Sequence, residues 1–177
     1  MIKKTKLTID NNPLSIYLQS ISNKFNSQNG GNSCSTDSNK SGIFQKQPRI
    51  IAVGDIHGDL EALFVALLKA NVIDLKGKWT GKDTYVVQLG DILDKGGRGQ
   101  DEDESRESVN EELVIIHFLN DLDEQAKKEG GRVLCILGNH ELMNVLKQNF
   151  DYVTQKGMQM NYQNKNRTEL VKPGGLL

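Results

Sequence analysis

A short apolar run that ends in a glycine-rich turn constrains the fold of this chain more than any other feature. Residues 49–53 carry β-forming side chains and lead into a Gly-Asp-Ile-His-Gly turn at 54–58, after which a helical pattern begins. A buried strand of this kind presents side chains at the carboxyl edge of a sheet, where open α/β folds bind ligands. Asp55 and His57 are two positions apart, so on an extended segment they point to the same side. A carboxylate and an imidazole aimed together suit Mn, Fe or Zn.

Two further junctions of the same kind follow along the chain. Residues 84–89 lead into a Gly-Asp-x-x-Asp turn at 90–94, and residues 132–137 lead into a Gly-Asn-His-Glu turn at 138–141. A single such turn has a purely structural explanation, but recurrence makes chance a poorer one. Parallel strands joined by right-handed helical crossovers would gather these turns at one edge of a sheet. The sequence therefore predicts an α/β fold with parallel strands and a polar site at that edge.

Two helical patterns separate the three predicted strands. In residues 59–70 the apolar positions recur at i, i+3, i+4, i+7 and i+8, which indicates a helix with one core-facing stripe. The second pattern spans about residues 107–128 and includes His117, which we interpret as a core or boundary histidine because no metal-spaced partner is near it. Trp79, in the intervening loop, is interpreted as a packing residue. Cys135 is predicted to be a small buried side chain of the third strand.

Composition divides the chain into two regions. The first, residues 1–47, is predicted to be mostly disordered, because its 22–42 stretch is dominated by Asn, Ser and Gly and has little apolar surface to offset the entropy of ordering. Residues 48–177 form the predicted domain, within which residues 150–154 are a candidate short strand. The apolar share of 37% and the mean hydropathy of −0.50 agree with a chain that is partly unfolded.

Charge and hydropathy argue against several classes of function. A formal net charge of −1 gives no basic surface for nucleic acid. No apolar run approaches the ~20 residues of a membrane span, and the amino terminus lacks the apolar segment of a secretory signal. Cys34 lies in a polar setting and Cys135 in an apolar one, so a disulfide is not expected and a reducing, cytoplasmic compartment is the default.

Taken in order, the three turns resemble the motifs of the calcineurin-like metallophosphoesterase superfamily, and specifically of its PPP-type protein phosphatases. The Gly-Asn-His-Glu-Leu-Met-Asn segment at 138–144, followed by Asp-Tyr-Val-Thr at 151–154, is most similar to the Shewanella-like phosphatases. The resemblance covers about residues 49–154. It implies a four-layer α/β/β/α fold, of which this chain would form mainly the amino-terminal βαβαβ half.

The resemblance also implies how metal ions would be bound. Asp55 and His57 would bind the first of two divalent ions (Mn, Fe or Zn), Asp91 would bridge both ions, and Asn139 would bind the second. A bridging carboxylate lets two cations lie close enough to activate one hydroxide and to hold a phosphate for in-line attack.

The catalytic and phosphate-binding residues follow from the same resemblance. His140 would protonate the leaving alkoxide, and Asp94 would orient His140. The family has an arginine directly after this aspartate, where the present chain has a lysine. Either Lys95 or the shifted Arg98 would therefore bind phosphate, together with Asn139. The exchange is not conservative, because lysine lacks the bidentate fork of arginine.

The largest departure from the family concerns the second metal ion. The family supplies two further histidines after Gly-Asn-His-Glu, whereas the 3 histidines here are His57, His117 and His140. We therefore expect a domain that is incomplete at its carboxyl end and that retains one of the two metal ions. An incomplete fold of this kind should leave one apolar face of a sheet exposed.

Three functional hypotheses remain open from the sequence. The first is a phosphatase that acts on phosphoserine, phosphothreonine or phosphotyrosine. The second is a truncated, inactive relative that acts as a binding module, and the third is a dinucleoside-polyphosphate hydrolase, since fold and motifs do not fix the substrate. The expected partner is a phosphoprotein or a small phosphoester, with no role for nucleic acid or membrane, and the sequence does not specify the oligomeric state.

Overall fold

A three-stranded parallel sheet forms the centre of the computed structural model, in the order β1-β2-β3. Its strands are β1 (Ile50–Val53), β2 (Tyr85–Gln88) and β3 (Arg132–Cys135). The predicted α/β fold with parallel strands is thus confirmed, although the strands are one or two residues shorter than expected. The structure describes residues 44–95, 110–147, 150–162 and 164–172.

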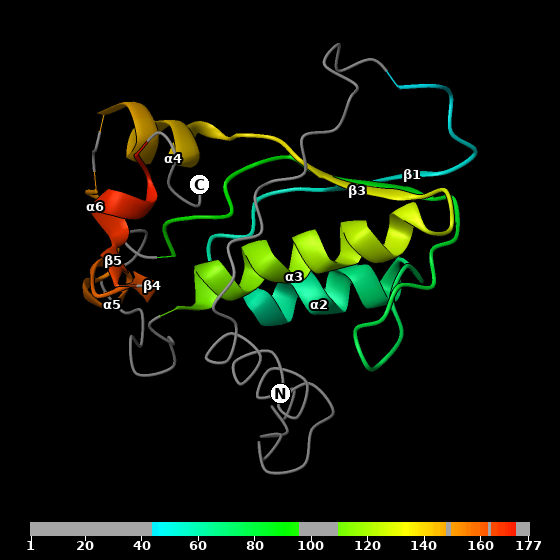
Figure 1. Cartoon of the computed structure of the whole chain (residues 1–177), viewed down its shortest axis with the longest axis horizontal. Coiled ribbons are helices and arrows are strands. Elements are labelled where there is room, and N and C mark those ends of the chain that lie inside the picture. Colours follow the sequence, from blue (N-terminus) through cyan, green and yellow to red (C-terminus); the bar gives the residue numbers. More distant parts are fainter. Residues whose placement is uncertain (1–43, 96–109, 148–149, 163, 173–177) are drawn as a thin grey trace, which may run out of the picture.

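Two helices connect the strands and cover the same face of the sheet (Figure 1). Helix α2 (Leu60–Lys69) follows β1, and helix α3 (Glu111–Lys127) follows β2. The strands lie in the sheet in the same order as in the sequence. Because the two crossovers have the same handedness, α2 and α3 lie on the same side of the sheet. Asp59 caps α2, since its side chain accepts a hydrogen bond from the N–H of Ala62 at 2.8 Å. None of the described helices is long and apolar enough to cross a membrane.

The hydrophobic core lies between the sheet and these two helices. Alternate strand residues, such as Val86 and Val133, point toward the helices and are buried. The predicted apolar stripe of α2 packs against these residues. Trp79 belongs to the same core and has 6% of its surface exposed, which confirms its predicted packing role. The apolar residues of these two helices with 0% of their surface exposed are Leu63, Leu67, Ile115, Leu122 and Ala126.

The opposite face of the sheet is not covered by a described helix or strand. Ile50 and Ala52 alternate with core-facing neighbours on β1 and are exposed, and Leu137, just past β3, is 65% exposed. The expected exposure of an apolar sheet face is therefore observed. The predicted burial of Cys135 is wrong, because its side chain is exposed. The residue ends an edge strand, which has a neighbouring strand on one side only.

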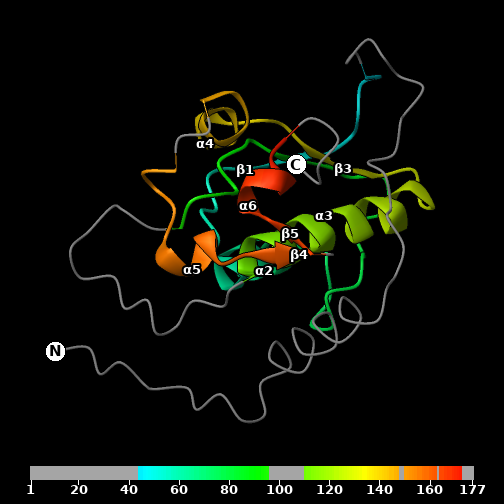
Figure 2. The ribbon, with the colours of Figure 1, turned by 60° about the vertical axis from the view of Figure 1, so that its left-hand side comes forward.

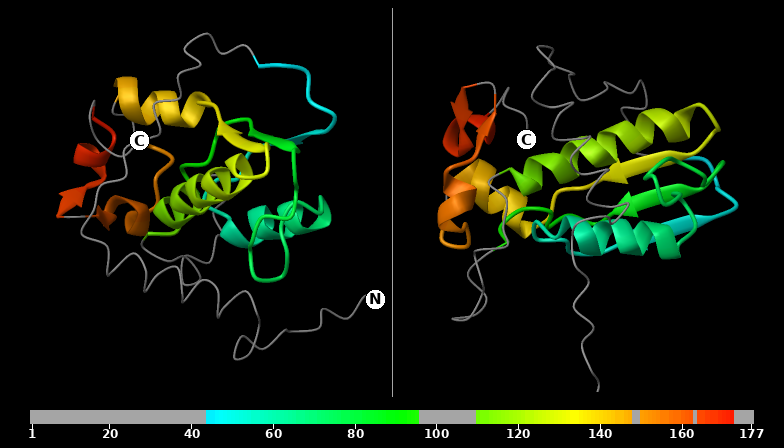
Figure 3. Two further views of the ribbon diagram at one scale, coloured as in Figure 1. Left: turned by 45° about the vertical axis from the view of Figure 1, so that its right-hand side comes forward. Right: turned by 90° about the horizontal axis from the view of Figure 1, so that it is seen from below.

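The remaining elements follow β3, and those after residue 150 form a small lobe at the start of α3 (Figures 2 and 3). After β3, α4 (Asn139–Leu142) continues into a π-helical turn, η3 (Met143–Lys147). We call the described residues from 150 to 172 the carboxyl-terminal lobe. Its Met160 and Leu170 pack on Leu113 of α3 as a second, smaller core. The elements of the lobe are α5 (Gln155–Met158), β4 (Asn161–Tyr162), β5 (Lys165–Asn166) and α6 (Arg167–Leu170).

The strand predicted at residues 150–154 is wrong. The N–H of Val153 donates to the carbonyl of Phe150 at 3.0 Å, which closes a turn. Thr154 is the N-cap of α5, and its hydroxyl accepts from the N–H of Gly157. Capping by threonine thus favours a helix start over an extended segment. The predicted disorder of residues 22–42 lies outside the described residues.

Candidate metal and phosphoester site

The three polar turns lie together at the carboxyl edge of the sheet. Backbone hydrogen bonds join the first turn to the second: the N–H groups of Ile56 and His57 both donate to the carbonyl of Asp91 at 2.9 Å. The N–H of Gly58 donates to the carbonyl of Ile92 at 2.7 Å. The first two junctions are therefore fixed relative to each other by main-chain contacts.

A single buried carboxylate joins the second turn to the third. Glu141 of α4 accepts N–H groups from Asp91 at 2.7 Å, Ile92 at 2.9 Å, Leu93 at 3.0 Å and Gly138 at 2.8 Å. These residues lie beyond the ends of β2 and β3, so their N–H groups do not pair within the described sheet. A side chain must therefore accept their hydrogen bonds. Glu141 stands in the quoted motif, but its role in holding the turns was not predicted from the sequence.

The turns approach one another so closely that a glycine is required at position 90. Gly90 has φ of +94°, and a Cβ there would lie 2.2 Å from the backbone nitrogen of Gly138. Three predicted site residues also adopt positive φ: His57 (+45°), Asp91 (+53°) and Asp94 (+67°). Such conformations cost about 1–3 kcal/mol each for residues other than glycine and cluster at functional sites. The surrounding hydrogen bonds hold these residues in place.

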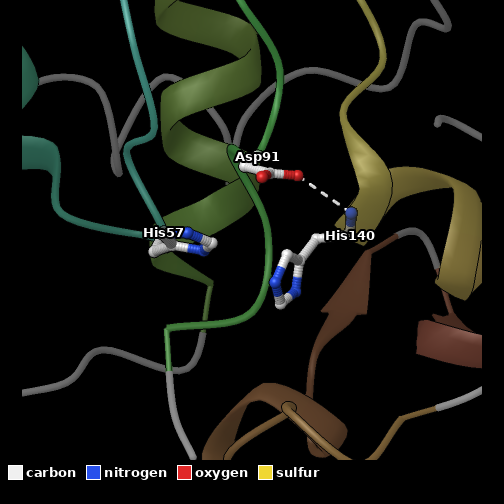
Figure 4. Close-up of side chains that lie close together, drawn as sticks. All are labelled: His57, Asp91 and His140. Atoms are coloured by element: carbon white, nitrogen blue, oxygen red, sulfur yellow. Dashed lines mark hydrogen bonds between the residues drawn. The ribbon is translucent and has the colours of Figure 1, made fainter. Parts of the chain in front are cut away.

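A cluster of potential metal ligands lies at the centre of the three turns (Figure 4). The ligand atoms of His57, Asp91 and His140 all lie within 4.8 Å of one another. The backbone N–H of His140 donates to the Asp91 carboxylate at 2.9 Å, which orients that side chain. The structure thus brings together one residue from each of the three predicted junctions.

The donor set of this cluster fits a divalent cation. Nδ1 of His57 donates to the carbonyl of Leu93 at 2.9 Å, which leaves the lone pair on Nε2. Nε2 is buried and has no hydrogen-bond partner among the described residues, while a carboxylate oxygen of Asp55 lies 3.8 Å away. A buried acceptor without a partner costs about 1–3 kcal/mol. An imidazole nitrogen beside carboxylates is a typical divalent-metal donor set.

The second predicted pair, Asp94 and His140, is in contact and buried. The carboxylate of Asp94 accepts from Nδ1 of His140 at 2.9 Å, and their side chains are 1% and 3% exposed. The amide of Asn144, in η3, also donates to Asp94 at 2.9 Å. Because a carboxylate only accepts, the hydrogen bond places the His140 proton on Nδ1.

A buried network behind Asp94 was missed by the sequence interpretation. The guanidinium of Arg167 donates to Asp94 and to Glu112, each at 2.6 Å, and to Asn144 at 3.0 Å. Burial raises the pKa of the Glu112 carboxyl, and the neighbouring Arg167 opposes that rise. Glu112 occupies a core-facing position of α3, and a carboxylate there was a usable signal. Nothing in the local sequence pattern singles out Arg167.

The other predicted site residues are less closely associated with the cluster. Asn139 begins α4 and is exposed. The ammonium of Lys95 forms a salt bridge with Glu111 at 2.7 Å, and Arg98 lies outside the described residues. His117 is not a member of the metal-ligand cluster found among the described residues, and burial lowers its pKa to about 4.

Comparison with known proteins identifies the family. The calcineurin-like phosphoesterase family profile matches residues 48–174. The chain belongs to this family. Membership implies divalent metal ions, for which the cluster of His57, Asp91 and His140 is a candidate site.

Individual phosphoesterases of this family agree with that assignment. The chain is 44% identical over 116 residues to Shewanella-like protein phosphatase 2 of Arabidopsis thaliana, which covers 66% of the chain and 26% of the relative. It is 36% identical over 116 residues to Shewanella-like protein phosphatase 1 of Plasmodium berghei, covering 66% and 28%. A crystal structure of the cold-active protein-tyrosine phosphatase of a psychrophilic Shewanella species matches with a TM-score of 0.54 and 29% identity, over 70% of this chain and 33% of that one. The chain thus spans about a quarter to a third of these relatives.

Proposed function

We propose that this chain carries the metal-binding and proton-donating residues of a phosphoesterase that hydrolyses phosphomonoesters of serine, threonine or tyrosine in proteins. The observation that supports the proposal most directly is the buried Nε2 of His57, which lies beside Asp91 and His140 and has no hydrogen-bond partner in the described part of the chain. Buried polar atoms are ordinarily hydrogen-bonded, and a divalent cation at this position would supply the missing partner.

Four residues would hold the metal ions: Asp55, His57 and Asp91, with Asn139 as the ligand of a second ion. Mn, Fe or Zn would supply Lewis acidity that neutralises phosphate charge and generates a hydroxide nucleophile. The Leu93 carbonyl keeps His57 in the tautomer that can coordinate. The hydrogen bond from the His140 backbone keeps the Asp91 carboxylate aimed at the cluster.

Proton transfer to the leaving group is assigned to His140. Its Nδ1–H is held by Asp94, so Nε2 is the ring nitrogen that would give a proton to the departing alkoxide. The acid that this step needs is the imidazolium form, in which both ring nitrogens carry a proton. Asp94 is thus a positioning residue rather than a proton donor.

Phosphate binding is assigned to Lys95 or Arg98, with Asn139. Lys95 is held by Glu111 and would have to exchange this partner for a phosphate oxygen. A phosphoprotein substrate is supported by the names of the relatives, two of which are protein phosphatases and one a protein-tyrosine phosphatase. The reducing, cytoplasmic compartment remains a prediction from the two cysteines.

The test is hydrolysis of p-nitrophenyl phosphate and of phosphoserine and phosphotyrosine peptides, with and without Mn²⁺. Asp91→Asn keeps the shape of the side chain and removes its charge, while Asp83→Asn makes the same change at an exposed residue away from the cluster. We expect metal-dependent turnover that Asp91→Asn abolishes and Asp83→Asn preserves. Metal binding by the unmodified chain without turnover would contradict a hydrolase and favour a binding module.

A further inference from the structure

We propose that Arg167 is a positioning residue, delivered by the carboxyl-terminal lobe, that holds the Asp94 carboxylate in the orientation in which it binds His140. The inference rests on the proposed function only for the role of the Asp94–His140 pair. The contact between Arg167 and Asp94 can be measured without a substrate.

The two oxygens of Asp94 are shared among three donors. One oxygen accepts from Nδ1 of His140 at 2.9 Å, and the other accepts from Arg167 at 2.6 Å. The amide of Asn144 lies between them, at 2.9 and 3.1 Å. With one oxygen held by the guanidinium, the carboxylate cannot rotate without breaking that contact. The other oxygen is therefore aimed at the imidazole.

Arg167 is itself fixed by contacts in two further directions. Its second terminal nitrogen donates to Glu112 at 2.6 Å, and Nε donates to the side-chain oxygen of Asn144 at 3.0 Å. The other oxygen of Glu112 accepts the backbone N–H of Asp94 at 2.8 Å, so the contacts close a ring. A planar guanidinium can serve three acceptors in three directions at once, whereas a lysine ammonium on a flexible stem cannot reproduce this arrangement.

The charges in this network favour the same role. Arg167 is 0% exposed and lies between two buried carboxylates, Asp94 and Glu112, which are 1% and 4% exposed. Taking such charges out of water is costly, and only pairing with hydrogen bonds offsets that cost. The Arg167 cation therefore compensates the carboxylate that faces His140.

The position of Arg167 depends on docking of the carboxyl-terminal lobe. The residue begins α6, whose start is fixed by a capping box between Asn166 and Glu169. Leu170 of the same helix packs with Met160 against Leu113, the residue after Glu112 on α3. Figure 2 shows α6, β4 and β5 gathered at that end of α3. The contacts that dock the lobe on α3 therefore also place Arg167 beside Asp94.

The test is NMR of the imidazole N–H groups in the metal-free chain, which has 3 histidines. The His140 Nδ1–H signal is assigned by its loss in His140→Gln. We expect a low-field, slowly exchanging signal in the unmodified chain and its loss in Arg167→Lys, with the amide signals of β1–β3 unchanged. The matched control is Arg132→Lys, which alters a two-contact pair with Asp123 at the far end of α3 and should leave the signal intact.

A second variant avoids direct damage to the network. Met160→Ala weakens docking of the lobe without changing a hydrogen-bonding group. We expect the Nδ1–H of His140 to exchange at least about tenfold faster, because losing a buried methionine costs more than the free energy of a tenfold change. This variant decides the question if Arg167→Lys does not fold. The proposal would be overturned if the unmodified chain lacked the His140 Nδ1–H signal. It would also be overturned if the chemical shift and the exchange rate of this signal were unchanged in both variants. Neither result depends on turnover, so failure here is distinct from failure of the proposed hydrolysis.

Discussion

Replacing Glu141 by glutamine should destabilise the whole site, although the two side chains have the same shape. Each oxygen of Glu141 accepts two backbone N–H groups, one oxygen from Ile92 and Leu93 and the other from Asp91 and Gly138. Glutamine keeps one oxygen and presents an NH₂ group in place of the other. Two buried N–H donors would then face a donor instead of an acceptor.

The magnitude follows from these four contacts. A hydrogen bond to a charged group contributes about 1.5–3 kcal/mol, so the loss of two gives a destabilisation of about 3–6 kcal/mol. A small domain has a free energy of unfolding of about 5–15 kcal/mol. Glu141→Gln should therefore remove a large fraction of the stability of the chain and separate the second turn from the third.

Urea denaturation followed by circular dichroism measures this change. Glu61→Gln is the control, because Glu61 is an exposed acid in the first turn of α2, and exposed substitutions usually change stability by less than about 0.5 kcal/mol. If Glu141→Gln lowers the free energy of unfolding by less than about 1 kcal/mol, these hydrogen bonds do not hold the turns as described.

Three further predictions concern the geometry and protonation of the chain. Gly90→Ala should lower the free energy of unfolding by more than about 2 kcal/mol, whereas Gly54→Ala, where a Cβ meets nothing within 4 Å, should change it little; equal effects in urea denaturation would refute the close approach. The pKa of His117 is about 4 in the folded chain, against the ordinary value of 6.5 that we take for the unfolded chain. Unfolded chains therefore bind more protons between these values, and stability should fall as pH decreases from 6.5 to 4. In His117→Phe that part of the decrease should vanish, and an unchanged pH profile would contradict the assignment. Asp94→Asn should leave metal affinity nearly unchanged and reduce hydrolysis of p-nitrophenyl phosphate by about 10²–10⁴-fold; full activity would exclude Asp94 as a positioning residue.

The sequence was sufficient to predict the sheet and the convergence of its turns. Strand and helix periodicity depend on local residue order, and the order of parallel strands follows from short crossovers of one hand. Burial of Cys135 was mispredicted because an apolar strand gives no indication of whether it lies at the sheet edge. The strand expected at 150–154 was wrong because capping by Thr154 outweighed β-propensity.

The network behind the site could not be predicted because it depends on contacts between distant residues. Arg167 and Asp94 are 73 positions apart, and Arg167 and Glu112 are 55 apart. A polar segment such as residues 161–170 gives no signal that its arginine is fully buried. A carboxylate on the apolar stripe of α3 was the one local indication, because Glu112 replaces a core residue at a helical spacing from Ile115 and Leu119.

The central claim is that the turns after β1, β2 and β3 form a site for divalent cations. Titration of the purified chain with Mn²⁺, with the free ion followed by electron paramagnetic resonance, measures this directly. We predict saturable binding that is weakened at least about tenfold, the equivalent of 1.4 kcal/mol, by Asp91→Asn and is unaffected by Asp83→Asn. Equal affinity in the unmodified chain and in Asp91→Asn, or no saturable binding in either, would contradict it.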